Sequence, residues 1–168
     1  MGFKKTSDLI AISFDLNESA PNTFTQEQVA LQLDVLNNEI AVVLAIDLDM
    51  TAPDALAGLD TRVTGAVTTT SQTGMTGLGN TNTMATSRMD IRAQGFVDGG
   101  VAFDRAADSS YTGGLDYIAL IATNNFFVGI LGANNIAAKN VSGRVWLYRA
   151  KADASTYAAL VQSEVLSA

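Results

Sequence analysis

Alternating apolar and polar residues constrain the fold of this chain more than any other feature. Between residues 28 and 36 every second side chain is apolar, namely Val29, Leu31, Leu33 and Val35. Successive side chains of a β-strand point to opposite faces, so this period of two predicts a half-buried strand. A helix is the alternative, but it would scatter the four apolar residues around its circumference.

The following segment, residues 40–50, keeps the period of two and is apolar on its second face as well. Its alternating positions are Ile40, Val42, Leu44, Ile46, Leu48 and Met50. Ala41, Val43 and Ala45 stand between them. A strand with apolar residues on both sides is typical of one that is covered on both faces.

Asparagine pairs separate several of the apolar runs. They are Asn37-Asn38, Asn124-Asn125 and Asn134-Asn135. Asparagine tolerates the left-handed backbone conformation that tight turns require. We therefore expect chain reversals at these pairs, and a chain built as a series of antiparallel hairpins.

Further segments have the composition of strands: residues 9–16, 62–70, 87–96, 115–122, 126–131 and 141–150, with a short piece at 101–103. With the two segments above, they give eight or nine strands. A chain of 168 residues is long enough to form one core without metals or disulfides. The sequence thus predicts an all-β, antiparallel two-sheet sandwich, in one domain of residues 1–168.

Three segments do not have strand character. Residues 71–84 are rich in Gly, Thr, Asn and Ser and predict an exposed loop, either a plain connection or a contact arm ordered by a neighbouring subunit. Residues 51–59 contain Pro53 and suggest a single helical turn capped by Thr51 or Asp54. Residues 154–166 have apolar residues at helical spacing, and predict a terminal helix capped by Asp153 or Ser155. The apolar face of that helix packs on its own sandwich or on a neighbour.

Charge and hydropathy exclude two classes of partner. The net charge of −7 repels a phosphate backbone, so we expect no direct contact with nucleic acid. The longest purely apolar run, from Ile40 to Ile46, is far shorter than the roughly 20 residues of a transmembrane helix. We also expect no secretory signal, because Asp8 and Asp15 interrupt the apolar stretch behind Lys4 and Lys5.

The chain contains no histidine and no cysteine, which removes the usual general base, thiolate nucleophile and imidazole ligand. We therefore expect no enzyme activity and no cofactor. Asp47 and Asp49 are weak candidates for a metal or glycosidase site, because they point to one face of a strand about 7 Å apart. The alternative is that both are solvated residues at a strand end.

Aromatic and apolar side chains late in the chain are candidates for subunit contacts. Adjacent strand residues such as Phe126 and Phe127 point to opposite faces, so only one of them can fill a given core layer. Trp146 and Tyr148 share a face, which suits a subunit contact or stacking on a sugar ring, with core packing as the alternative. The subunit-interface candidates are Phe126, Phe127, Trp146, Tyr148, Tyr157 and Leu160.

The last third of the chain contains LDYIAL at 115–120, NNFFVGI at 124–130, VSGRVWLYR at 141–149 and then the final helix. This order of features resembles single jelly-roll virion proteins of tailless icosahedral viruses. It implies an eight-stranded jelly roll whose copies form capsomers and then an icosahedral shell. It also implies contacts with other copies and with other virion proteins, a place in the virion, and synthesis in the host cytoplasm. No catalytic residue is implied.

Two functional hypotheses follow. The first is a structural subunit that self-assembles into a viral capsid or similar shell, favoured by the low charge, the missing catalytic side chains and the 71–84 loop. The second is a carbohydrate- or ligand-binding β-sandwich module, favoured by Trp146, Tyr148 and the Asp47/Asp49 pair. A glycosidase or isomerase that uses only carboxylates is a more distant third.

Overall fold

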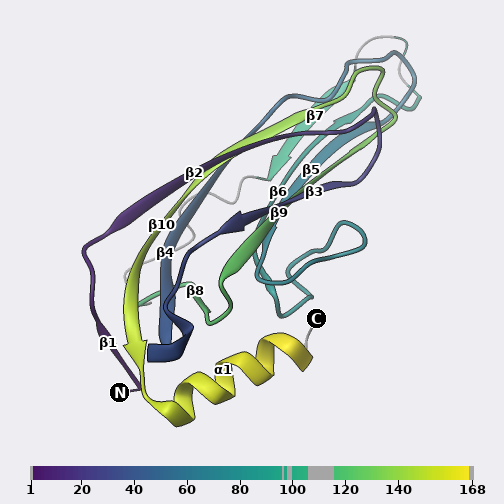
Figure 1. Ribbon diagram of the computed structural model, residues 1–168. Coiled ribbons are helices and arrows are strands. Elements are labelled where there is room, and N and C mark those ends of the chain that lie inside the picture. The colour runs from purple at the N-terminus through teal and green to yellow at the C-terminus, as the bar shows by residue number, and fades with distance from the viewer. Residues whose placement is uncertain (1, 96, 98–99, 106–115, 167–168) are drawn as a thin grey trace.

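Ten strands form two antiparallel sheets in the computed structural model, which describes residues 2–95, 97, 100–105 and 116–166 (Figure 1). The first sheet contains β1 (Phe3–Lys5), β2 (Ile10–Asn17), β4 (Glu39–Met50), β8 (Ala119–Ile121) and β10 (Asn140–Ala152). The second contains β3 (Thr25–Ala30), β5 (Thr61–Thr68), β6 (Thr83–Arg92), β7 (Val101–Arg105) and β9 (Asn125–Ala133). A short 3₁₀ turn, η1 (Val35–Asn37), and the terminal helix α1 (Ala154–Leu166) complete the described part.

The strands pair in a nested order. β2 pairs with β10, β3 with β9, β4 with β8 and β5 with β6. This is one long antiparallel ribbon, and rolling it up adds the pairs β4 with β10 and β5 with β9. The resulting strand orders, β2-β10-β4-β8 and β3-β9-β5-β6, are those of a jelly roll. The expected all-β jelly-roll sandwich with a C-terminal helix is therefore confirmed, with ten strands in the described ranges instead of the expected eight or nine.

The expectation of consecutive hairpins holds for β5, β6 and β7, which pair in sequence order, but it is wrong for the Asn-Asn turns. Asn38 and Asn134 do take the left-handed conformation, with φ of 56° and 60°. However, the turns at all three Asn-Asn pairs connect strands of different sheets, β3 to β4, β8 to β9 and β9 to β10. A left-handed residue reverses the chain locally. Which strand becomes the hydrogen-bonding partner is decided by contacts with segments that are distant in the sequence.

The strand predicted at residues 28–36 is displaced. β3 ends at Ala30, because Gln32 adopts a positive φ of 55° and breaks the extended conformation. Leu31 and Leu33 still enter the core, and the carbonyl and side chain of Asn124 accept their backbone N–H groups. Val35 lies in η1 and is 44% exposed. The alternation of apolar residues in the sequence therefore extends past the end of β3.

Two other sequence expectations need correction. Residues 51–59 contain no helical turn, and Asp54 bonds a neighbouring loop instead of capping its own segment. β6 begins at Thr83, within the predicted 71–84 loop, and Met75 of that loop is half-buried beside Phe24 and Gly129. The predicted strand ends at Phe96 and Leu115 lie outside the described residues.

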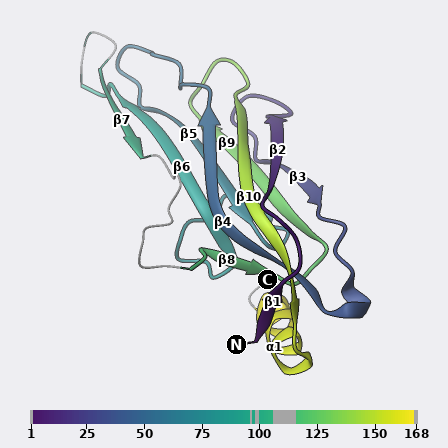
Figure 2. The ribbon, with the colours of Figure 1, turned by 90° about the vertical axis from the view of Figure 1, so that its left-hand side faces the viewer.

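The first half of β4 is covered on both faces, as its sequence predicted. Ala41 and Val43 face the core between the sheets, where they join Val63, Phe126 and Val145. Ile40 and Val42 face the opposite way and are fully buried by a second apolar cluster that includes Tyr157, Leu160 and Val161 of α1. Both ribbon views place α1 and the N-terminus at the same end of the sandwich (Figures 1 and 2).

α1 is held at its start and near its end. The Asp153 carboxylate accepts the Thr156 backbone N–H at 2.7 Å, so Asp153 is the N-cap, and this bond lowers its pKa. Glu164 is only 6% exposed, and its Oε1 accepts the Ala122 N–H at 2.8 Å. Its Oε2 is buried without a hydrogen-bond partner. No helix in the described ranges is long and apolar enough to span a membrane.

The packing of β10 against its neighbours leads to a test of Gly143. A Cβ at this position would lie 2.4 Å from the Asp47 carbonyl and 2.7 Å from the Phe14 ring. We expect Gly143→Ala to lower the free energy of unfolding by about 2 kcal/mol, measured by chemical denaturation. Gly79→Ala is the matched control, since no atom lies within 4 Å of its Cβ, and it should leave stability unchanged within about 0.5 kcal/mol.

The buried Glu164 carboxyl predicts a pH-dependent contribution to stability. Burial raises its pKa, so the folded state favours the protonated acid, and stability falls as the pH rises from 4.5 through the raised value. Glu164→Gln removes this charge and keeps the oxygen that accepts the Ala122 N–H. Urea unfolding should show the variant more stable than wild type at pH 7, by about 1 kcal/mol. The difference should shrink towards pH 4; a pH-independent difference would contradict this account.

Candidate functional site

Beyond the part covered by α1, the outer face of the first sheet presents three neighbouring strands in register. On the central strand, β10, Arg144 lies between Ser13 of β2 and Asp47 of β4. One step along, Ser142 lies between Asp15 and Asp49. In the other direction, Trp146 lies between two small residues, Ala11 and Ala45. The fold thus builds a regular grid of polar groups beside one indole.

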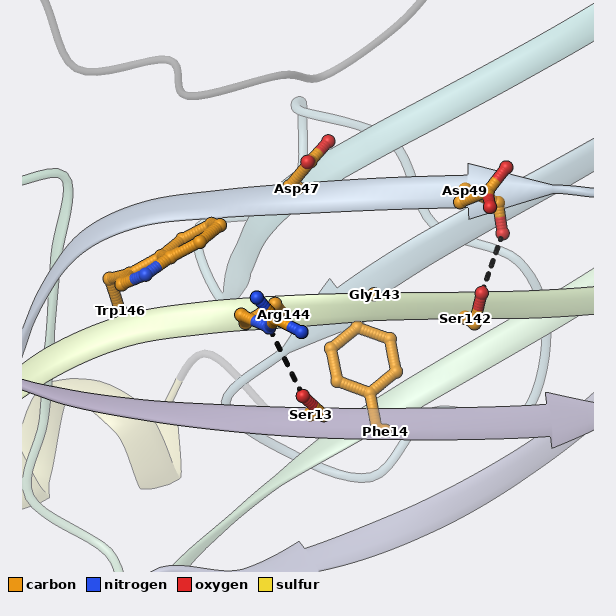
Figure 3. Close-up of a pocket in the computed structure, with 8 residues that line it drawn as sticks. All are labelled: Ser13, Phe14, Asp47, Asp49, Ser142, Gly143, Arg144 and Trp146. Atoms are coloured by element: carbon orange, nitrogen blue, oxygen red, sulfur yellow. Dashed lines mark hydrogen bonds between the residues drawn. The ribbon is translucent and has the colours of Figure 1, made fainter.

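These residues line a shallow depression of about 380 Å³ (Figure 3). Arg144 donates from Nε to the Ser13 hydroxyl at 3.2 Å, and its guanidinium carbon lies 5.9 Å from the centre of the Trp146 ring. Ser142 donates to the Asp49 carbonyl at 3.5 Å. The lining residues are Ser13, Phe14, Asp47, Asp49, Ser142, Gly143, Arg144 and Trp146.

Asp47 and Asp49 share one face, as the strand period predicted, and both are exposed. Within the described ranges, no group of three or more Asp, Glu, His or Cys residues could hold a metal ion. The two carboxylates are therefore best considered as hydrogen-bond acceptors that open into the depression. Sequence reasoning missed Ser13 and Phe14, because only the β2–β10 register brings them to this place.

Of the interface candidates, only Trp146 lies in this depression. Phe126 is fully buried in the core, edge-on to Phe14 with ring centres 6.3 Å apart, so core packing accounts for it. Phe127 points to the outer side of the second sheet and is half-buried. Tyr148, Tyr157 and Leu160 belong to the cluster beneath α1. There they attach the helix to its own sheet.

A second surface lies at the end of the sandwich opposite α1. Here residues 18–24, 54–60, 93–95 and 134–139 come together (Figure 1), and we call this surface the braced loop end. Glu18 is buried, and its carboxylate accepts the backbone N–H groups of Gly132 and Lys139 at 2.9 and 2.8 Å, and that of Thr23 at 3.1 Å. One carboxylate thereby joins three segments.

Asp54 and Asp60 extend this brace. The Asp54 carboxylate accepts from the Ile136 N–H at 2.7 Å and from the Lys139 ammonium at 2.7 Å. The Lys139 hydrogen bond is the main reason that the pKa of Asp54 falls to about 2. Asp60 accepts the N–H groups of Ala93 and Gln94, and those bonds lower its pKa too. The loops are thus fixed by charged side chains bonded to backbone.

Large apolar side chains project from the loops fixed in this way. Ile136 is 71% exposed and Leu59 is 41% exposed. The two lie on adjacent loops, because Asn134 donates to the Asp60 carbonyl and Asp54 accepts from Ile136. Val101 and Phe103 of β7, which starts at the same end, are 48% and 55% exposed. Exposed apolar side chains that form a contiguous patch are typical of interaction sites.

No protein-family model and no curated protein sequence matches this chain. Among solved structures, one of Desmodium yellow mottle tymovirus matches with 15% identity and a TM-score of 0.33, over 88% of this chain and 91% of that chain. Apo chimpanzee polyomavirus VP1 matches with 9% identity and a TM-score of 0.38, over 89% and 100% of the chains. Turnip yellow mosaic virus matches with 12% identity and a TM-score of 0.29, over 85% and 94%. All three are structures from viruses.

The brace predicts how Asp54 contributes to stability. Because the folded-state pKa of about 2 lies below the ordinary 3.8, the ionised carboxylate stabilises the fold above that ordinary value. This contribution is lost as the pH falls from 3.8 through 2. We expect Asp54→Asn to lower the free energy of unfolding at pH 7 by about 2 kcal/mol, since it removes charged hydrogen bonds and leaves the buried Lys139 unpaired.

Denaturation curves for wild type and Asp54→Asn at pH 7 and pH 2.5 test this account. The two proteins should differ clearly at pH 7 and converge at the lower pH. Asp8→Asn, which removes an exposed carboxylate from the β1–β2 connection, is the control and should leave both values unchanged. Equal stability of wild type and Asp54→Asn at pH 7 would show that the brace contributes nothing.

Proposed function

We propose that this chain is a non-catalytic structural subunit that self-assembles into a viral capsid or a similar shell, with the braced loop end as a main contact between copies. On this proposal the protein resides in the virion, and its principal partner is a second copy of itself. Other virion proteins are further partners.

The fold is compatible with this function but does not select it. Jelly rolls form viral capsids, and they also form lectin domains and cupins. A capsid subunit differs from these in requiring a surface that other copies cover. The proposal therefore depends on whether the chain presents such a surface in a form ready for contact.

The braced loop end is the observation that carries the proposal. Leu59 and Ile136 project apolar surface into water, and burial of one such side chain stabilises a complex by about 1.5–3 kcal/mol. The carboxylates of Glu18, Asp54 and Asp60 already hold the loops in place. A contact made by such loops loses little conformational entropy, so more of the burial free energy remains for association.

A carbohydrate-binding module is the second candidate, and the depression at Trp146 is the observation that favours it. The two functions use different parts of the molecule. The depression lies on the outer face of the first sheet, whereas the apolar side chains lie at its end. One chain can therefore have both properties, and separate variants can test them.

Light scattering coupled to size-exclusion chromatography, with electron microscopy of the same fractions, tests self-assembly. Wild type should form trimers, pentamers, hexamers or larger particles. The double variant Leu59→Ser/Ile136→Ser should weaken association at least about a hundredfold, because about 3 kcal/mol or more of burial is lost at each contact.

Leu36→Ser is the matched control. Leu36 is 92% exposed and lies in η1, at the α1 end of the sandwich. It should assemble like wild type if the braced loop end makes the contact. A wild-type chain that stays monomeric at high concentration would refute self-assembly. Equal weakening by both variants would instead refute the assignment of the contact to the braced loop end.

A further inference from the structure

We propose that the depression on the outer face of the first sheet binds a neutral saccharide, with Trp146 as the stacking platform. This inference goes beyond shell formation and does not depend on it, since every lining residue comes from a single chain. The proposal rests on three features: a partly exposed indole, convergent polar groups, and a rigid floor.

The indole of Trp146 is half-buried, and its strand neighbours are small. Ala11 and Ala45 flank it on β2 and β4, and neither side chain rises high enough to cover an aromatic ring. A bulge between Trp146 and Leu147 separates this region from the part of the sheet beneath α1. The flat apolar faces of sugar rings stack on such partly exposed aromatic rings, while the sugar hydroxyls reach polar groups around the ring.

Polar groups of complementary kinds surround the indole. Asp47 and Asp49 are exposed carboxylates that accept hydrogen bonds from hydroxyl groups. Arg144 donates, and Ser13 and Ser142 both donate and accept. Figure 3 shows these side chains on three adjacent strands around the same depression. Its volume of about 380 Å³ falls within the range of ligand sites, and a few placed polar groups beside apolar surface are typical of them.

Two observations favour a neutral ligand over a charged one. Asp15, Asp47 and Asp49 are three carboxylates in the grid around the single cation Arg144, so an acidic sugar would be repelled. The same carboxylates attract a cationic ligand, but the position that a cation would take beside the indole is already filled. Arg144 already occupies the cation position beside the indole, with its guanidinium carbon 5.9 Å from the ring centre.

The floor of the depression is rigid. β10 is hydrogen-bonded to β2 on one side and to β4 on the other over the whole of this region. Beneath it, Phe14 packs against the backbone of Gly143, where a larger residue would collide with the ring. The side chains that face the ligand are therefore positioned before binding, which reduces the entropic cost of binding.

Fluorescence titration tests the proposal directly, because Trp146 is the only tryptophan of the chain. The probes are neutral galacto-, gluco- and manno-oligosaccharides, their sialylated counterparts, and spermidine as a cationic probe. We expect a saturable change in emission with at least one neutral series. The sialylated forms should bind at least tenfold more weakly, and spermidine should produce no saturable change.

The variant Asp47→Asn tests whether the saccharide binds in this depression. It removes the carboxylate charge and keeps a side chain of the same size. It should weaken binding of the neutral saccharide at least tenfold. Glu27→Gln, which changes an exposed carboxylate on β3 of the other sheet, is the matched control and should bind like wild type. Calorimetry on the same proteins provides a measurement that does not depend on the tryptophan.

Several outcomes would overturn the inference: no response to any neutral saccharide, preference for the sialylated or the cationic probe, or unchanged affinity in Asp47→Asn. None of them affects self-assembly, which light scattering measures separately. Conversely, a monomeric chain that binds the neutral saccharide would support this site and count against the proposed shell function.

Discussion

Nested pairing of strands distant in sequence is the constraint on which the rest of this structure depends. β2 needs β10, β3 needs β9 and β4 needs β8, so each sheet is assembled from both ends of the chain. Most connections between consecutive strands then pass from one sheet to the other, the exceptions being β1 to β2, β5 to β6 and β6 to β7. The outer faces of the sheets can therefore present side chains from several neighbouring strands. The ends of the sandwich consist of loops that contact one another.

The outer face of the first sheet is divided between two purposes. Near α1, Ile40 and Val42 are buried under Tyr157 and Leu160, and the helix completes a second apolar layer. Past the bulge at Trp146, the same strands present Asp47, Asp49 and Arg144 to solvent. The register shift is what allows one strand to serve as packing surface at one end and as a polar surface at the other.

Local features could be predicted from the sequence, because their causes are local. The strand at β4, the left-handed Asn38 and Asn134, and the Asp153 cap each follow from a few neighbouring residues. The single alternating face expected for residues 40–50 is wrong, because the bulge opposite Trp146 places Ile46 and Leu48 on the core face and Ile40 and Val42 on the outer face. Pairing at the Asn-Asn turns was predicted wrongly, because it depends on segments distant in the sequence. For the same reason the sequence gave no sign that Arg144 and Ser13 join Asp47 and Trp146, or that Asp54 and Glu18 fix distant loops.

The nested order also bears on how the chain folds as it is synthesised. β10 is the central partner in the first sheet, contacting β1, β2 and β4, yet it is synthesised after all three of them. Until it emerges, β2 and β4 lack their shared neighbour and the core stays open on that side. α1 follows immediately and covers Ile40 and Val42, so both apolar layers close only after β10 and α1 have been made. Exposed strand edges in the nascent chain therefore persist until β10 has been made.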